Sequence, residues 1–565
     1  MNIMRVFPAC LLFLAPLGLL GSIPELSLNK AEEGKLTPGV PVSCSIALNA
    51  GDYADISIKL NQSSALAQIF DSADTKVRAA NLEDAAHIAF VAPTAGRYRI
   101  ELLPKTPGNY SITWQDKISL EQRVAPTPQP PRLEGPRIKA LRAALASGEA
   151  NAVPAFWDEM KARGVPLIEP LEGHPNERLA TFLWHGNADT RRVLLMWRWL
   201  MMTAPEKCSL SQLEKTNVWF ATFKMNSAKL LRYRYVENGP DLPTDDNPTS
   251  GKNMRVLWSL SEIDPLNPKR VEAADTQADV DRFHGSSVLE MPDAPPEPWL
   301  QRREGVASGA ISTGTIHSTL LGNDRTVKVY RPPGYKSDGK PYAVIYMMDG
   351  DKYLDDISIG RVLDNLLSEH RIPPFVAVLI NNAPGARGAE LGGNPVFADF
   401  MATELVPWAH RSYNVTSDPR RVVIGGLSAG GIAAAYTAFR HPDVFGNVLS
   451  QSGSFWWHPP QKGPNGHPSD PGPPWMASQF LESPRLPIRF SLSAGTDEID
   501  PSGGGGVILI PNRELRDVLL AKGYQVFYRE VDGEHDTLNW RPIFPEALLL
   551  LAKGMDEAKP APGSE

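Results

Sequence analysis

Hydrophobic and polar residues alternate in short runs near the start of the chain. Turn-forming residues separate these runs, which lie at residues 43–48, 54–60, 96–102 and 109–114. A repeat of two residues places successive side chains on opposite faces of a sheet, so that one face can be buried and the other exposed. The pattern predicts a β-sandwich over residues 25–123.

The middle of the chain opens with a proline-rich segment at residues 124–137, which predicts an extended linker. Helical spacing of apolar residues follows at residues 138–146 and 153–163, and a glycine lies beyond each of these helices. Strand patterns then return at residues 179–185, 193–202, 218–225 and 229–236. We therefore predict a second β-sandwich domain over residues 138–298.

The last part of the chain, residues 299–555, alternates strand and helix patterns. An antiparallel pair of strands is predicted first, at residues 313–320 and 325–330. The later strand patterns are separated by helical stretches and lie at residues 342–348, 375–380, 421–424, 447–451, 488–494 and 526–531. This alternation predicts a mostly parallel sheet flanked by helices.

A G-x-S-x-G motif at residues 426–430 is the first indication of a catalytic function in the last domain. It lies between a β-branched run at residues 422–424 and an alanine-rich helical pattern at residues 432–439. A strained strand-to-helix turn of this kind exposes the serine hydroxyl at the edge of the sheet. We predict that Ser428 is a nucleophile and that the last domain has the α/β-hydrolase fold.

A nucleophilic serine needs a base, and the base needs an acid that orients it. In the α/β-hydrolase fold the histidine follows the last strand, which is the position of His535 after residues 526–531. The acid follows an earlier strand, and residues 488–494 are followed by both Asp497 and Glu498. From the residues alone either carboxylate is a candidate, and a Ser–His dyad without an acid is a third possibility.

The composition is that of an ordinary globular protein of 565 residues, which is long enough for several domains. The formal net charge of -7 and the lack of long basic runs predict no nucleic-acid partner. The spacing of cysteines and histidines matches no metal-binding motif, so we expect no metal. Cys44 and Cys208 fall in different predicted domains and are expected to be free, buried thiols.

The first 22 residues carry one positive charge at Arg5, an apolar run and a pair of small residues at positions 21 and 22. This pattern predicts a cleaved signal peptide at residues 1–22, with an uncleaved anchor as the alternative. We therefore expect an exported protein, periplasmic or secreted. No other stretch is long and apolar enough to predict a stable membrane span.

A series of motifs resembles the enterochelin (catecholate siderophore) esterases. That family carries F-W, P-L-[IV]-E-P, T-F-L-W-x-G, D-V-W-[YF], L-x-Y-x-Y, D-P-L-N-P and S-V-L-E-[LM]-P-D-A-P in this order. The matching segments here are residues 156–157, 166–170, 181–186, 217–220, 231–235, 264–268 and 287–295. The resemblance covers residues 150–551. Residues 25–123 lie outside it and instead resemble the pre-peptidase C-terminal domains of exported hydrolases.

The resemblance implies roles for several residues of the last domain. A G-x-x-E pattern places the triad acid at Glu498 rather than Asp497, and a D-G-x turn implies that Asp351 supplies a backbone N–H to the oxyanion hole. The G-x-S-x-G motif assigns the other oxyanion donor to the N–H of Ala429. Where the family has G-G-H-D, this chain has Glu534 in place of the second glycine, and we expect this change to alter the pocket rim.

Substrate-binding residues are implied by two further segments. An R-x-x-E-L-x-x-N pattern at residues 387–394 implies that Arg387 meets an anionic or phenolate-rich substrate and that Glu390 helps to hold it. The alternative is a pair of residues that braces the loop internally. Trp457, in an aromatic segment after a strand pattern, is a candidate for stacking on an aromatic acyl group, or else part of the core.

The function that the resemblance implies is a serine carboxylic ester hydrolase that cleaves siderophore-type catecholate esters through an acyl-enzyme, without a cofactor. An iron–catecholate complex is one candidate substrate. The same triad would serve a feruloyl or other glycan-linked ester hydrolase or an acyltransferase, and an inactive binding protein is the alternative from a different class. We expect the second sandwich to pack over the mouth of the active site. We expect the first sandwich to be attached to the rest of the molecule only through its linker.

Overall fold

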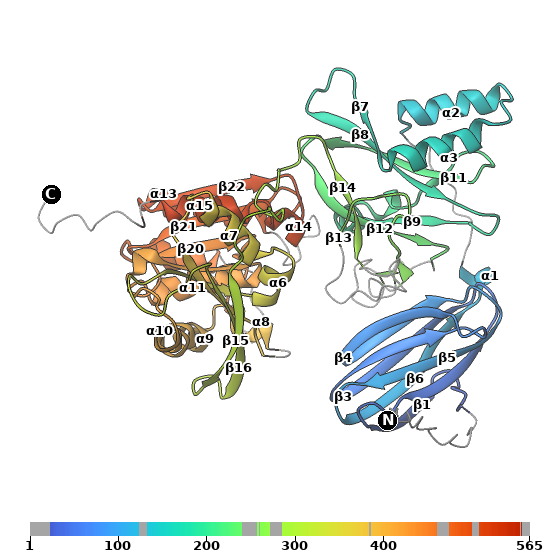
Figure 1. The fold of residues 1–565 in the computed structure, drawn as a ribbon. Coiled ribbons are helices and arrows are strands. Elements are labelled where there is room, and N and C mark those ends of the chain that lie inside the picture. The colour runs from blue at the N-terminus through green and yellow to red at the C-terminus, as the bar shows by residue number, and fades with distance from the viewer. Residues whose placement is uncertain are drawn as a thin grey trace, which may run out of the picture.

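The computed structural model describes residues 23–123, 133–239, 257–258, 260–271, 285–383, 386–459, 474–499, 508–553 and 555. The predicted signal peptide and most of the predicted linker lie outside these residues. Figure 1 shows three parts in chain order, two built mainly of strands and a third in which helices surround a sheet. Among the described residues, no helix combines the length and the apolar character needed to cross a membrane.

The first part is a six-stranded sheet with the strand order β1-β6-β3-β5-β2, in which β4 also pairs with β3. The strand bounds are β1 (Ala31–Leu36), β2 (Val42–Leu48), β3 (Tyr53–Phe70), β4 (Lys76–Val91), β5 (Gly96–Pro104) and β6 (Gly108–Ile118), and a short helix α1 (Leu120–Arg123) follows. The first half of β3 pairs with β6 and its second half pairs with β5. Ile56 and Ile58 lie on one face of β3 in the apolar core, as the repeat of two predicts, and Asp55 and Ser57 on the other face are also buried.

The second part begins with α2 (Pro136–Ala146) and α3 (Ala152–Arg163). Two four-stranded sheets follow, with the orders β10-β11-β8-β7 and β13-β14-β12-β9. Their strands are β7 (Leu167–Pro170), β8 (Glu177–His185), β9 (Val193–Met196), β10 (Ser211–Gln212), β11 (Val218–Asn226), β12 (Leu230–Glu237), β13 (Arg270–Val271) and β14 (Ser286–Glu290). Edge-to-face contacts such as Phe182 with Tyr233, whose ring centroids lie 4.9 Å apart, join one sheet to the other.

Two predictions for the second part need correction. The linker ends earlier than predicted, because Pro136 and Arg137 form the first turn of α2, where proline is well tolerated. The predicted strand 193–202 stops at Met196, and the rest forms helix α4 (Arg198–Thr203) followed by a 3₁₀ turn (Pro205–Lys207). Residues 193–202 form an apolar run that only Arg198 interrupts, and such a run fits a buried strand and a helix equally well.

The first part does not depend on its linker alone. Tyr53 and Ala89 are buried in the same hydrophobic cluster as the core of the second part, and Val91 and Ile118 pack against that cluster. The two parts therefore share an apolar contact. Cys44 in the first part and Cys208 in the second are free and buried, as the sequence predicts.

The third part is an eight-stranded sheet with the order β15-β16-β18-β17-β19-β20-β21-β22. An antiparallel hairpin, β15 (Ala310–Ser318) and β16 (Asn323–Arg331), forms one edge. The other strands run parallel and are β17 (Ala343–Met348), β18 (Phe375–Ile380), β19 (Val422–Leu427), β20 (Asn447–Gln451), β21 (Arg489–Gly495) and β22 (Gln525–Val531). This is the mostly parallel sheet that the alternation predicted.

Helices cover both faces of the third sheet (Figure 1), which explains why its central strands are buried on both sides. One face packs against α9 (Pro395–Phe400), a π-helix (Met401–Leu405), α10 (Val406–Ser412), α11 (Ala429–Arg440), α12 (Trp475–Glu482) and α13 (Leu509–Ala521). The other packs against α6 (Gly350–Asp355), α7 (Ile359–Ser368), α14 (Thr537–Trp540) and α15 (Phe544–Ala552). Along β17, Val344 and Tyr346 belong to the first core and Ala343 and Ile345 to the second.

Candidate active site

Ser428 occupies the turn between the parallel strand β19 and helix α11. Its backbone has φ 58° and ψ −122°, a strained conformation for a residue with a side chain. Two backbone hydrogen bonds hold the turn, from the Ser428 N–H to the Gln451 carbonyl and from the Ser454 N–H to the Ser428 carbonyl, each 2.9 Å long. A Cβ on Gly426 would lie 2.6 Å from the Gly430 backbone, so the motif glycines allow this close approach.

The structure brings Ser428, His535 and Glu498 into one hydrogen-bonded chain. His535 Nε2 lies 2.8 Å from Ser428 Oγ, and His535 Nδ1 lies 2.8 Å from Glu498 Oε1. Trp540 packs edge-to-face on the imidazole with ring centroids 4.9 Å apart, which restricts rotation of the ring. The arrangement fits a tautomer in which Nδ1 donates to the carboxylate and Nε2 accepts the serine proton.

The two candidate acids have different partners. Glu498 is only 5% exposed, and its second oxygen accepts a hydrogen bond from the Gly495 N–H at 2.8 Å. Asp497 points to Lys229 of the second part, with 2.6 Å between Asp497 Oδ2 and Lys229 Nζ. Burial raises the pKa of Asp497, and Lys229 only partly offsets this. The structure therefore places Glu498, and not Asp497, against His535.

The two predicted oxyanion donors differ in availability. Ala429 is the first residue of α11, where backbone N–H groups have no carbonyl partner within the helix and the helix dipole favours negative charge. The N–H of Asp351 is instead bonded to Asn381 Oδ1 at 3.1 Å, and its carboxylate pairs with Lys328 at 2.7 Å. The turn after β17 packs closely on the end of β18, and the amide that the prediction assigns to the oxyanion hole therefore already has a side-chain partner.

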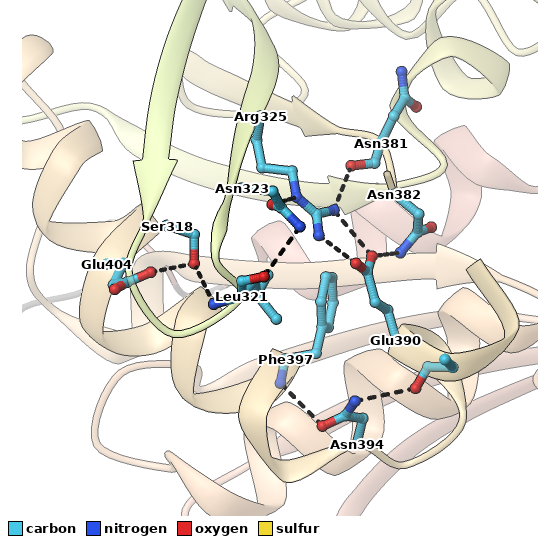
Figure 2. A network of polar contacts seen from close by, with 11 residues as sticks. Ser318, Leu321, Asn323, Arg325, Asn381, Asn382, Glu390, Asn394, Phe397 and Glu404 are labelled. Carbon is cyan, nitrogen blue, oxygen red and sulfur yellow. Dashed lines mark hydrogen bonds and ion pairs between the residues drawn. The ribbon is translucent and has the colours of Figure 1, made fainter. Parts of the chain in front are cut away.

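Glu390 does not face the active site. Figure 2 shows it enclosed by Arg325 and Asn382, and both side chains donate to it, at 2.9 Å from Arg325 Nη1 and at 2.6 Å from Asn382 Nδ2. Arg325 lies on β16 and Glu390 on α8 (Arg387–Leu391), and both side chains are buried. A buried carboxylate needs such a partner, and these contacts fasten the edge hairpin to α8.

Arg387 also has an internal partner, although not the one that its sequence position suggested. Its Nε and Nη2 donate to the two carboxylate oxygens of Asp349 at 2.6 and 2.7 Å. This bidentate pair ties α8 to the turn after β17. The alternative in which Arg387 and Glu390 brace each other is therefore wrong in its pairing, because each binds a separate residue.

A cavity of about 230 Å³ opens beside Ser428 and is shared by two parts of the molecule. The second part contributes one wall from α4, and the third part contributes the triad residues and their neighbours. The lining residues are Arg198, Trp199, Met202 and Thr203 on one side, and Ser428, Ser454, Trp456, Asp497, Glu498, Ile499, Ile508, Glu534 and His535 on the other. The second part thus packs over the mouth of the site, as expected from the sequence.

Trp457 is not one of these lining residues. It packs edge-to-face on Trp475 with ring centroids 5.2 Å apart, and it lies over Gly393. The neighbouring Trp456 is 39% exposed and lines the cavity. Adjacent side chains point in different directions, so the sequence signal was correct for the tryptophan pair but did not identify which member faces the site.

Sequence reasoning missed the residues of α4, because the run that contains them was taken for a strand. It did single out Glu534, which replaces a family glycine and lines the cavity. Trp197 Nε1 donates a hydrogen bond to Glu534 Oε1 across the boundary between the second and third parts. Burial raises the pKa of Glu534 to about 8, although the bond from Trp197 opposes this shift.

Two family models match the chain. The one described as Putative esterase matches residues 318–551, and the one described as Enterochelin esterase, N-terminal, matches residues 179–300. Together they cover most of the second and third parts. Neither reaches the first sheet.

Curated relatives extend this match. The iron(III) salmochelin esterase of Escherichia coli O6:H1 is 28% identical over 73% of this chain and 97% of that protein. The iron(III) enterobactin esterase of the same strain is 30% identical over 60% of this chain and 81% of that protein. A shorter match is to an endo-1,4-β-xylanase/feruloyl esterase of Xylanibacter ruminicola, which is 26% identical over 28% of this chain and 24% of that protein.

Solved structures agree with the relatives. The ferric enterobactin esterase of Salmonella typhimurium superposes with a TM-score of 0.57 at 25% identity, over 70% of this chain and 98% of that one. The enterobactin esterase of Shigella flexneri, solved in the presence of 2,3-dihydroxy-N-benzoyl-serine, gives a TM-score of 0.53 at 26% identity, over 70% of this chain and 97% of that one. The chain belongs to the enterochelin esterase family and is a serine esterase with an α/β-hydrolase-like catalytic part.

Proposed function

We propose that this protein hydrolyses the ester bonds of catecholate siderophores through an acyl-enzyme on Ser428. The observation that carries the proposal is the chain of two 2.8 Å contacts from Ser428 through His535 to Glu498. Two relatives that align with this chain over most of their length are named iron(III) salmochelin esterase and iron(III) enterobactin esterase. These names support the substrate class.

In the first step the Ser428 Oγ attacks the ester carbonyl carbon while His535 Nε2 takes the hydroxyl proton. Glu498 stabilises the imidazolium that forms, because its buried carboxylate faces Nδ1. The tetrahedral intermediate then collapses, the ester C–O bond breaks, and the leaving alkoxide receives the proton from Nε2. A water molecule, deprotonated by His535, then attacks the acyl carbon. The bond from this carbon to Ser428 Oγ breaks, Oγ takes the proton back from Nε2, and the carboxylic acid leaves.

The negative oxygen of the intermediate needs hydrogen-bond donors that are fixed before the reaction. We assign one of these to the N–H of Ala429, at the start of α11 directly after the nucleophile. The helix dipole adds to this stabilisation, because a helix N-terminus carries about half a positive charge.

The cavity walls suit an aromatic acyl group. Trp199, Met202, Trp456, Ile499 and Ile508 supply apolar and aromatic surface around the serine. A Shigella flexneri relative was solved in the presence of a dihydroxybenzoyl-serine, which is the kind of group that such walls would accept. A ferulate ester would fit the same chemistry, and transfer of the acyl group to an alcohol uses the same triad. An inactive binding protein is disfavoured, because the triad geometry is intact.

We also infer that the first two parts are β-sandwich domains bounded near residues 25–123 and 136–298, and that the chain is exported. The folding of β3 across two partner strands and the facing sheets of the second part support the sandwich architecture. The charged start and apolar run of residues 1–22 support export.

The test of the proposed function is a product assay with four substrates. A tricatecholate lactone, its iron complex, a feruloyl sugar and a short nitrophenyl ester are each incubated with the full chain and with Ser428→Ala. We expect both lactone forms or one of them to be opened faster than the feruloyl sugar, and no product with the variant. Preference for the feruloyl sugar would replace the siderophore by a glycan-linked ester.

A further inference from the structure

Lys229 belongs to the second part of the molecule, and its side chain contacts the loops of the third part that carry the triad acid and the triad histidine. It lies in the short turn between β11 and β12, and its side chain is only 8% exposed. Its Nζ lies 2.6 Å from Asp497 Oδ2, and it also forms an ion pair with Asp532. Burial alone disfavours the ammonium, but the two aspartates outweigh it and the pKa of Lys229 is raised. Lys229 is therefore charged at neutral pH.

The two aspartates belong to the same loops as the catalytic groups. Asp497 directly precedes Glu498, and Asp532 lies three residues before His535. The loops are joined by backbone hydrogen bonds from Thr496 N to the Val531 carbonyl at 2.8 Å and from Asp497 N to the Gly533 carbonyl at 3.1 Å. Two poorly solvated carboxylates at this junction repel each other unless a cation lies between them.

The second part also holds the residues on both sides of His535. Arg232 on β12 donates from Nε to Asp536 Oδ1 at 2.7 Å and from Nη2 to Thr537 Oγ1 at 2.6 Å. Trp197 donates to Glu534 on the other side. The histidine loop therefore lies between contacts from the second part. The third part adds the backbone pairing, a side-chain hydrogen bond from Thr496 to Asp532 and the packing of Trp540 on His535.

We propose that Lys229 is a positioning residue for the Ser428–His535–Glu498 triad, which it serves by neutralising Asp497 and Asp532 and so holding the acid loop against the histidine loop. The second part then completes the catalytic geometry in addition to lining the cavity. This inference rests on the proposed ester hydrolysis at Ser428, and it does not depend on which ester is the natural substrate.

The charges give a sharp test. Lys229 and its two aspartates carry a net charge of −1, which becomes −2 in Lys229→Met and returns to −1 in the double variant Lys229→Met with Asp497→Asn. If Lys229 acts through charge, removing the carboxylate along with the ammonium restores the geometry. If Lys229 only fills space, the second substitution brings no recovery.

The experiment measures kcat and KM of the full chain on a short nitrophenyl ester, which is too small to need the α4 wall. We expect Lys229→Met to lower kcat by about 10- to 100-fold with KM changed by less than about 3-fold, because the loss falls on the transition state. The double variant should recover to within about 5-fold of Asp497→Asn alone. The control is Lys224→Met, which removes an exposed lysine of β11 that pairs with Glu177 and should change nothing.

A normal kcat for Lys229→Met would overturn the inference, as would a double variant no faster than Lys229→Met. If Lys229→Met fails to fold, the comparison of the double variant with Asp497→Asn still decides, since a large deficit in the double variant contradicts a charge-based role. Failure of the proposed substrate is separable, because a chain that cleaves the nitrophenyl ester but no catecholate ester would contradict that proposal alone.

Discussion

The first and second parts of this molecule are both built from strands and both precede the catalytic part, yet they relate to it in different ways. The second part sends α4 into the cavity and Lys229 and Arg232 into the histidine and acid loops. The first part buries Tyr53 and Ala89 against the second, and none of its described residues lines the cavity beside Ser428. Two parts built from strands can therefore differ in what they contribute to the cavity, according to the side chains that they place at the boundary.

The largest expected effects test the catalytic part alone. We predict that Ser428→Ala and His535→Ala each lower ester hydrolysis by about 10⁴-fold or more and abolish labelling by a fluorophosphonate, because attack needs both the hydroxyl and its base. Labelling is followed by intact-protein mass spectrometry. Full labelling of either variant would show that another group is the nucleophile or the base.

Next in size is the contrast between the two acids. Glu498→Gln should lower kcat by about 10³-fold or more, because the amide cannot stabilise the imidazolium, whereas Asp497→Asn should cost far less. Steady-state kinetics on a short ester measures both variants. The reverse ranking would give the orienting role to Asp497, and small losses in both would favour a Ser–His dyad.

A smaller and more selective effect is expected from the cavity wall. Trp199→Ala removes aromatic surface that the second part supplies, so kcat/KM on a bulky aromatic ester should fall by about 10-fold or more, which corresponds to a loss of about 1.4 kcal/mol or more. Hydrolysis of a short nitrophenyl ester should stay within a few-fold of the unchanged chain. Equal losses on both esters would mean that Trp199 supports the fold rather than selectivity.

Removing the first part should have little effect on catalysis. A chain that starts after residue 131 should hydrolyse the short ester within a few-fold of the full chain, because none of the described residues of the first part lines the cavity. Its melting temperature should fall, because Tyr53 and Ala89 no longer cover the apolar surface of the second part. A large loss of kcat in a folded truncated chain would place the first part in the catalytic unit.

The smallest effect is a pH dependence of stability at the boundary between the second and third parts. Burial raises the pKa of Glu534 to about 8 in the folded chain. The protonated side chain therefore contributes fully to folding stability below the pKa that Glu534 has in the unfolded chain, and this contribution is lost as pH rises towards 8. Glu534→Gln keeps an acceptor for Trp197 but cannot ionise. Its melting temperature relative to the unchanged chain should therefore be higher at pH 8 than at pH 5, and an equal difference at both pH values would contradict the shift.

Sequence reasoning selected the three residues that the structure brings into one hydrogen-bonded chain, because their signals are local or follow the order of the strands. The G-x-S-x-G turn marks Ser428, and the strand order places His535 and Glu498 after it. The parallel strands were also predictable, because burial on both faces leaves nearly unbroken apolar runs. The same feature caused the error at residues 193–202, since an apolar run alone does not separate a strand from a helix such as α4.

Other parts of the site depend on pairs that are distant in the chain. Glu390 was read with its neighbour Arg387, but its partner Arg325 lies 65 residues away. Lys229 and Asp497 are 268 residues apart. No periodicity or motif connects such residues, because only the packed fold brings the charges together. The prediction that Trp457 stacks on the acyl group missed the neighbouring Trp456 for a simpler reason. Which of two adjacent side chains faces a cavity depends on the turn that carries them.

One measurement tests most directly whether the second part acts on the triad itself or only on the cavity. It compares kcat on a short nitrophenyl ester for the combined variant Lys229→Met with Arg232→Met against Trp199→Ala, each in the full chain. We predict that the charge variant loses at least about 10-fold in kcat, because both sides of His535 are released, while Trp199→Ala stays within a few-fold. A normal kcat in the folded charge variant would show that the second part is only a wall of the cavity.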